Sequence, residues 1–396
     1  MRKIYGRNPE KVYNILDNVW FIAEEIAKMK RPIIPVLCIL ILMLSLSGCT
    51  KEDAHAVVAP VVADALGEQL EGIVRPAAEE TETEPEIPVI DPAIRIQRGT
   101  RVAVVSQSVR GGFWATIENG MKQAVKDINE AYGLTKEDQI RLTFEGPDRE
   151  GDVDTQTNIL DAVIAENPDV LCLSVSDMHS CQAQLEAAKE NGIPVVAFNS
   201  SVSEEGLVCA YRATNHFKAG QIAGYRLSLA MGKMGKVAIF TSQEKSQSTQ
   251  DRIRGFRNMT DAYGDIEIVE IVYMENVENM EAAMQEVLAS HLNLTGVFCT
   301  NAEISELYLN MKKDETLESV AMVGADASAR QLEAVRKGEE VGIVSQNPFA
   351  LGYQTVWAAV RAESSTPEEL PETFLLNPMW IDASNIDEEG MQSYMY

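Results

Sequence analysis

The chain has 396 residues and a formal net charge of −26, from 60 acidic and 34 basic residues. Because such an acidic surface repels phosphate backbones, we expect no nucleic-acid partner. The sequence has neither an HExxH run nor paired CxxC motifs, and we therefore expect no metal and no cofactor.

An apolar block of residues 32–46 is the first distinct segment, and it follows the basic pair Lys30-Arg31. It is shorter than the roughly 20 apolar residues of a membrane span, which favours a cleaved signal. The block ends in Ser47-Gly48-Cys49 and resembles a bacterial lipoprotein signal. The resemblance implies that the chain is cleaved before Cys49 and that the Cys49 thiol carries a diacylglycerol. The lipid would hold the protein on the outer side of the bacterial cell membrane. The alternative is an anchor that is not cleaved.

Residues 1–48 are thus expected to be a lipoprotein signal peptide. Residues 1–28 carry several acidic side chains and would make an unusually long leading region, so we expect translation to begin at Met29. Residues 49–98 are rich in charge and proline and poor in aromatic residues, which predicts a flexible tether.

From residue 101 onward, apolar β-rich runs alternate with segments of helical periodicity. Such strands, apolar on both faces and joined by helices, predict an α/β protein with parallel sheets covered on both sides. The length exceeds one typical core, so we expect two lobes. The expected strands are 101–105, 141–144, 170–173, 195–198, 236–240, 266–272, 296–299, 321–323 and 341–344.

Polar and aromatic residues follow several of these strands. Ligands of open parallel sheets bind beyond the carboxyl ends of the strands, where such residues lie together. Aromatic rings can stack on the faces of a sugar, while arginine, carboxylate and amide groups supply donors and acceptors for its hydroxyls. The candidate ligand-binding residues are Phe113, Trp114, Asn199, Arg252, Asn301, Asp326 and Gln346.

The ordered motifs Phe113-Trp114, Thr214-Asn215, Val323-Gly324-Ala325-Asp326 and Gln346-Asn347-Pro348, with Arg252 between them, resemble the type I periplasmic binding proteins of the ribose/galactose kind. The resemblance covers residues 100–385. It implies two doubly wound parallel-sheet lobes joined by a three-strand hinge. Residues 99–213 and 347–373 would form lobe 1, residues 214–346 and 374–382 lobe 2, and residues 383–396 a C-terminal tail.

Two departures from the family pattern concern the site. Many members have an Asn-Pro pair before the aromatic residues, where this chain has Gly111-Gly112, and an aspartate-led pair where it has Asn199-Ser200. Without the aspartate of that pair, the site loses charge-assisted hydrogen bonds, each worth about 1.5–3 kcal/mol when buried. The sequence therefore leaves the particular solute open.

Each candidate residue also has a structural alternative. Phe113 and Trp114 could be core residues, Asn301 and Asp326 could cap helices, and Arg252 could form a surface ion pair. Gln346 could belong to the hinge. The body cysteines Cys172, Cys181, Cys209 and Cys299 are expected to be structural residues in apolar surroundings.

These features predict a lipid-anchored, extracytoplasmic solute-binding protein that delivers a carbohydrate to an ABC importer by hinge closure, and not an enzyme. The first alternative is a sensor whose closed form docks on a membrane receptor or histidine kinase. A secreted sugar-processing enzyme lacks support because no positioned carboxylate pair is evident. A DNA-binding regulator has still less support, because the signal stands where the DNA-binding helices of such a regulator are expected.

Overall fold

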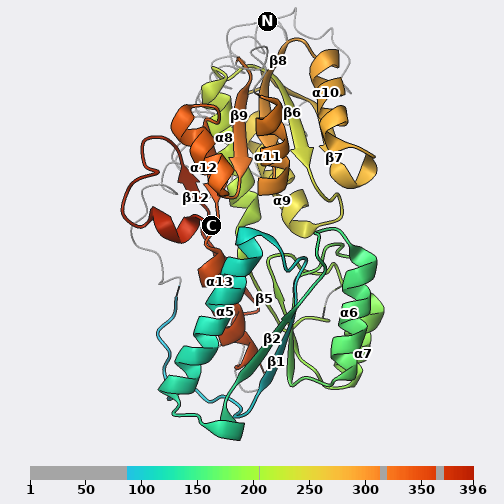
Figure 1. The fold of residues 1–396 in the computed structure, drawn as a ribbon. Coiled ribbons are helices and arrows are strands. Elements are labelled where there is room, and N and C mark those ends of the chain that lie inside the picture. The colour runs from blue at the N-terminus through green and yellow to red at the C-terminus, as the bar shows by residue number, and fades with distance from the viewer. Residues whose placement is uncertain (1–86, 205, 313–318, 363–369) are drawn as a thin grey trace, which may run out of the picture. The chain divides into compact units, whose positions relative to one another are not determined.

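A computed structural model describes residues 87–204, 206–312, 319–362 and 370–396. The expected signal peptide, Cys49 and the tether up to residue 86 lie outside the described residues. Two six-stranded sheets organise the rest, each in its own α/β lobe (Figure 1). Within the described ranges, no helix has both the length and the apolar character needed to cross a bilayer.

The sheet of lobe 1 is parallel throughout, in the order β11-β5-β4-β3-β1-β2. Helices α5 and α13 share a core with one face of this sheet, and α6 and α7 share a core with the other. The strands are β1 (Arg101–Val105), β2 (Arg141–Glu145), β3 (Val170–Leu173), β4 (Val195–Phe198), β5 (Ala210–Thr214) and β11 (Thr373–Leu376). The helices are α5 (Gly111–Ala131), α6 (Val153–Ala165), α7 (Gln182–Glu190), α13 (Pro348–Ala359) and the short η1 (Lys136–Asp138).

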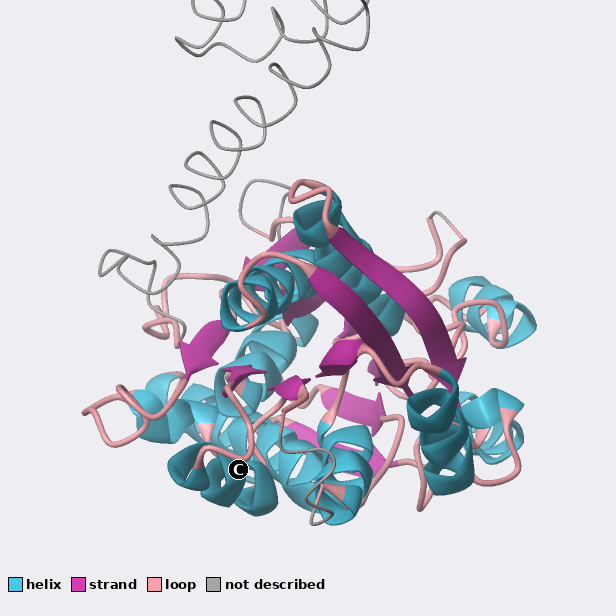
Figure 2. Ribbon diagram, turned by 90° about the horizontal axis from the view of Figure 1, so that it is seen from above, coloured by secondary structure: helices cyan, strands magenta, loops and turns pink. Residues whose placement is uncertain are grey.

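The sheet of lobe 2 has the order β12-β10-β9-β8-β6-β7, and only β12 runs antiparallel to its neighbour. Helices again lie on both sides of the strands (Figure 2). The strands are β6 (Gly235–Thr241), β7 (Ile266–Tyr273), β8 (Leu294–Cys299), β9 (Ala321–Ala325), β10 (Gly342–Ser345) and β12 (Met379–Ile381). The helices are α8 (His216–Ala230), α9 (Gln247–Asp261), α10 (Met280–Ser290), α11 (Ala302–Met311), α12 (Ala329–Lys337), η2 (Met274–Asn276) and η4 (Met391–Tyr394).

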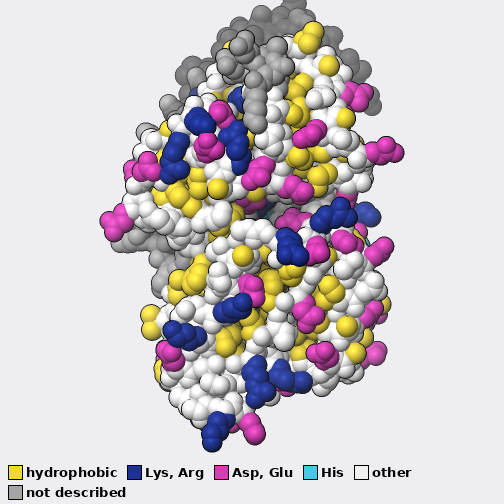
Figure 3. Space-filling model, viewed as in Figure 1, with side chains coloured by type: hydrophobic (Ala, Val, Ile, Leu, Met, Phe, Trp, Pro, Cys, Tyr) yellow, Lys and Arg dark blue, Asp and Glu magenta, His cyan; other side chains and the backbone are white. Residues whose placement is uncertain are grey.

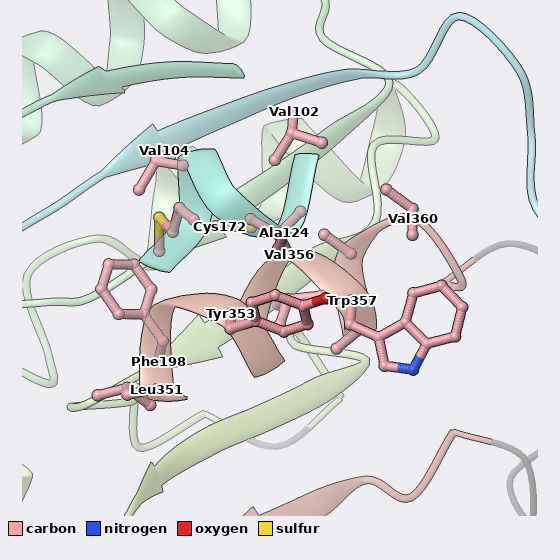
Figure 4. Close-up of a cluster of buried hydrophobic side chains, with 14 of the residues drawn as sticks. Val102, Val104, Ala124, Cys172, Phe198, Leu351, Tyr353, Val356, Trp357 and Val360 are labelled. Atoms are coloured by element: carbon pink, nitrogen blue, oxygen red, sulfur yellow. The ribbon is translucent and has the colours of Figure 1, made fainter. Parts of the chain in front are cut away.

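The lobe 1 core shows why this sequence forms buried parallel strands. Every residue of β3 and β4 is buried, as expected for strands with helices on both faces. Tyr353 and Val356 of α13 belong to the same buried cluster as the strand residues Val102 and Val104 (Figure 4). Helix α13 is therefore apolar nearly all round, which fits a helix buried in the protein.

The chain passes between the sheets three times: from β5 to α8, from β10 to α13 and from β11 to β12. This agrees with the expected three-strand hinge connectivity. The last crossing comes later than the expected boundary at residue 374, because Thr373–Leu376 pairs with β5 of lobe 1. Only β12 of the segment 374–382 joins the lobe 2 sheet.

Both ends of the described chain are more ordered than the sequence indicates. Residues 87–98 fall in the expected tether, yet Ile90, Ile94 and Ile96 pack against the lobe 1 core. Residues 383–396, expected only as a tail, bury Ile386 and Tyr394 against lobe 2. Apolar side chains spaced along these segments supply the surface that holds them.

Three strands were absent from the sequence prediction: β5, β11 and β12. Strand β5 has Arg212 at its centre, which hides its buried character; the guanidinium Nη1 donates to the Pro371 carbonyl at 3.0 Å. The four cysteines among the described residues are free, and three of them are buried as expected. Cys209 is exposed, because it lies just before β5 rather than within it.

Candidate functional site

A cavity of about 360 Å³ is lined by residues of both lobes. Its size falls within the range of small-molecule sites, roughly 300–1,000 Å³. The structure brings all seven candidate ligand-binding residues to its wall: Phe113, Trp114, Asn199, Arg252, Asn301, Asp326 and Gln346. On the face drawn in Figure 3, acidic and basic side chains gather where the two lobes meet.

Strand ends position four of these residues. Asn199 follows β4, Asn301 follows β8, Asp326 follows β9 and Gln346 follows β10. Asn199 and Asp326 have φ angles of 58° and 74°. Asparagine and aspartate tolerate this left-handed region better than most residues, so the backbone can turn sharply into the cavity as each strand ends.

The aromatic pair lies in the first turn of α5. The rings of Phe113 and Trp114 meet edge to face, with centroids 5.1 Å apart. Trp114 is only 2% exposed and also contacts Phe198, so it belongs to the core as well as to the cavity wall. The expected ligand role and the structural alternative are thus compatible for this residue.

Asp326 is the centre of a hydrogen-bond network. Gln346 Nε2 donates to its Oδ1 at 2.8 Å, and the backbone N–H of Ala302 donates to its Oδ2 at 3.0 Å. Arg252 Nη2 lies 3.7 Å from Oδ1, and both side chains of this ion pair are about nine-tenths buried. The Asp326 carboxylate therefore joins α9, α11 and β10 at one point.

Arg252 is placed by close packing of two helices. A Cβ on Gly220 of α8 would lie 2.0 Å from the Arg252 carbonyl oxygen, so only glycine lets α9 approach so near. The Arg252 guanidinium is buried and its Nη1 donates to the carbonyl of Thr300 at 2.5 Å. The alternative of an exposed ion pair does not describe this residue.

Asn301 has the capping role that the sequence left open. Its Oδ1 accepts from the N–H of Ile304 at 3.0 Å, and its Nδ2 donates to Ser242 Oγ at 3.1 Å. Both polar groups already have a partner in the protein, although the residue lines the cavity.

Three residues that line the cavity each have a buried polar atom without a hydrogen-bond partner among the described residues: Asn199 Oδ1, Arg252 Nε and Gln346 Oε1. Leaving such a group buried without a partner costs about 1–3 kcal/mol. Two of the atoms accept and one donates, and this is the mixture that a hydroxylated ligand requires.

Glu150, in the loop between β2 and α6, is a site residue that the sequence analysis missed. Its Oε1 accepts from Trp114 Nε1 at 2.6 Å. Burial raises the pKa of Glu150 to about 7; the hydrogen bond from Trp114 opposes this, and the nearby charges of Asp326 and Glu303 add to it. Asp148 and Asp152 flank it in the sequence, and no pattern shows which of these carboxylates turns inward.

Tyr396 is the second missed residue. It lines the cavity together with Phe113, and the two ring centroids lie 5.5 Å apart. Its position predicts only a tail, and nothing in the sequence pattern brings it to the strand ends. Among the described residues, no cluster of three or more His, Cys, Asp or Glu could hold a metal ion.

Two α/β lobes with a polar, aromatic cavity between them define a solute-binding protein of the periplasmic type. The family model described as "Periplasmic binding protein domain" matches residues 102–365, and the chain belongs to this family. The resemblance drawn from the sequence is therefore confirmed, and the family is one of binding proteins rather than enzymes.

Its relatives are distant in sequence. The ribose import binding protein of Bacillus subtilis is 24% identical over 54% of this chain and 68% of its own length. The xylose/arabinose-binding protein of Sulfolobus acidocaldarius is 20% identical over 51% of this chain and 54% of its own. An ABC transporter solute-binding protein from Agrobacterium vitis, solved with α-D-tagatopyranose, has 23% identity and a TM-score of 0.68, covering 75% of this chain and 99% of that one.

Proposed function

We propose that this protein binds a monosaccharide or polyol in the cavity between its lobes. The proposal is supported by three unpartnered buried atoms, Asn199 Oδ1, Arg252 Nε and Gln346 Oε1, which belong to residues lining a cavity that aromatic residues also line. Sugar hydroxyls both donate and accept, so one ligand can satisfy all three atoms. The apolar face of a sugar ring can pack against the aromatic ring of Phe113.

We infer that the protein works outside the cytoplasm, where it delivers its bound solute to an ABC importer. The names of the sugar import and solute-binding relatives support this role. Ligand contacts from both lobes favour a closed arrangement by their differential affinity, and a permease can recognise that arrangement. The hydrogen bond from the Ser201 N–H to Gln247 Oε1, 3.1 Å long, already joins lobe 1 to lobe 2 and would be part of the closed form.

The binding proposal is tested by thermal shift of the full chain against D-ribose, D-xylose, L-arabinose, D-tagatose, D-fucose and xylitol, with citrate as a non-sugar control. A ligand at 100 times its dissociation constant stabilises by about 2.7 kcal/mol, which corresponds to several degrees in melting temperature. We expect at least one sugar or polyol to raise the melting temperature and citrate to leave it unchanged. A panel without any shift contradicts the proposal.

We further propose that Cys49 carries a lipid that holds the protein at the membrane, because the run before it matches a lipoprotein signal. Replacing Cys49 by serine is expected to move the protein from the membrane fraction to the soluble fraction, since the modified thiol is lost. Cell fractionation and mass spectrometry of the N-terminal peptide measure this. A wild-type N-terminal peptide that carries no added lipid mass on Cys49 argues against the anchor.

A further inference from the structure

Residues 390–396 turn back onto the cavity from lobe 2. Gly390 has a φ of 95°, which begins the turn, and Tyr394 is buried in the cluster with Ala327 and Ile343. Ser345 Oγ, at the end of β10, donates to the carbonyl of Tyr394. Figure 1 shows this end of the chain next to the start of α5. The segment is therefore anchored on lobe 2 just before it reaches Tyr396.

Tyr396 contacts both lobes. Its backbone N–H donates to the carbonyl of Ala327 at 3.3 Å, and its hydroxyl donates to Asp326 Oδ1 at 3.1 Å. On the other side its ring lies against Phe113 of α5, at a tilt of 55°. Burial raises the pKa of Tyr396 well above its ordinary value, and the charge of Asp326 adds to the effect. The phenol therefore keeps its proton and remains a donor.

Gly112 makes room for this placement. A Cβ on Gly112 would lie 2.8 Å from the carbonyl carbon of Tyr396 and 3.2 Å from its oxygen. Atoms do not approach so closely without displacement, so a side chain at position 112 would push the Tyr396 backbone away. Gly112 belongs to the Gly-Gly pair that stands where many members of the family have Asn-Pro, and a glycine at this position leaves room for the Tyr396 backbone.

The Tyr396 hydroxyl also changes what Asp326 offers a ligand. A carboxylate has about four acceptor positions. Tyr396 and Gln346 both donate to Oδ1, and Ala302 donates to Oδ2. Most of the acceptor capacity of Asp326 is thus used within the protein. The Tyr396 oxygen, with its proton committed, keeps lone pairs that can accept from a ligand hydroxyl.

We propose that Tyr396 is a specificity-determining residue of the ligand site, forming an aromatic wall beside Phe113 and taking over part of the hydroxyl recognition from Asp326. The proposal rests on the function proposed above. Tyr396 then selects for solutes that donate a hydroxyl to the phenol oxygen and place an apolar face beside its ring.

The first experiment tests whether Tyr396 is packed in the cavity of the ligand-free protein. With 3-fluorotyrosine at position 396, the ¹⁹F resonance is expected away from its position in the urea-unfolded chain. Gly112→Val is expected to move it toward that position, and Ser393→Ala, an exposed change in the same segment, to leave it in place. A wild-type resonance at the unfolded position overturns the proposal.

The second experiment measures dissociation constants by calorimetry for the six sugars and polyols above. Tyr396→Ala and Gly112→Val are expected to weaken the best ligand about tenfold or more, since a lost aromatic wall and a lost hydrogen bond together reach this range. Tyr396→Phe, which retains the ring, is expected to change the order of preference among the ligands with a smaller loss. Ser393→Ala should bind as the wild type does.

Unchanged or tighter binding by Tyr396→Ala overturns the proposal, because the ring would then be a plug that the ligand displaces. If the wild-type protein binds none of the six solutes, the proposed function itself fails and this proposal fails with it. That outcome is recognised without any variant, so the two failures are distinguishable.

Discussion

Replacing Asp326 by asparagine is expected to lower the free energy of unfolding by about 3 kcal/mol, the lower end of the range for breaking a buried ion pair. The change removes the carboxylate that faces the buried Arg252 guanidinium, while the arginine remains charged. The lower end applies because the Nη2–Oδ1 distance is 3.7 Å and Arg252 keeps its bond to Thr300.

Sugar binding is expected to be lost in the same variant. The single amide oxygen of asparagine cannot accept from Gln346, Tyr396 and Ala302 together, so the wall around the cavity rearranges. Urea unfolding and calorimetry measure the two effects.

Asp387→Asn is the matched control. Its partner Arg336 lies 2.9 Å away, but the two side chains are 48% and 80% exposed, and such pairs contribute about 0–1 kcal/mol. An Asp326→Asn variant that unfolds and binds as the wild type does would show that the network around Asp326 does not organise the site.

Replacing Glu150 by glutamine is expected to stabilise the protein at pH 8 and to have little effect at pH 5. The folded-state pKa of about 7 lies above the ordinary value of 4.5, so the folded protein binds the proton more tightly than the unfolded chain does. The free energy of unfolding therefore falls as the pH rises from about 4.5 to 7, and the full cost of the buried charge is present above that window. Glutamine removes the charge but can still accept from Trp114.

The gain at pH 8 should be about 1–2 kcal/mol, allowing for solvent screening of this half-buried side chain. Melting temperatures measured across the pH range give the result. Glu333→Gln serves as a control of opposite sign, because Lys337 lowers the pKa of that exposed carboxyl. A Glu150→Gln difference that is the same at pH 5 and pH 8 would mean that the fold does not raise the pKa of Glu150.

The strand-end rule explains how much of the site could be predicted. In parallel sheets the carboxyl ends of neighbouring strands meet at one edge, so Asn199, Asn301, Asp326 and Gln346 could be placed together from strand positions alone. Phe113 and Trp114 follow the same logic from the helix after β1. Arg252 lies within α9 and depended on the family resemblance, since nothing in the periodicity of that helix says which residue reaches the cavity.

The missed features depend on contacts between distant parts of the chain. Tyr396 reaches Asp326 across 70 residues of sequence. Strands β11 and β12 have only four and three residues, too few for an alternating pattern to stand out, and they form by pairing with β5 and β10. The Gly112 departure is visible in the sequence, but its close approach to the Tyr396 backbone appears only in the fold.

The most direct test of the account is a crystal structure of the protein with the sugar or polyol that gives the largest thermal shift. We predict that the ligand lies in the cavity between the lobes, with its hydroxyls within hydrogen-bond distance of Asn199 Oδ1, Arg252 Nε and Gln346 Oε1. A ligand bound elsewhere, or one in the cavity that leaves these three atoms without a ligand contact, would contradict it.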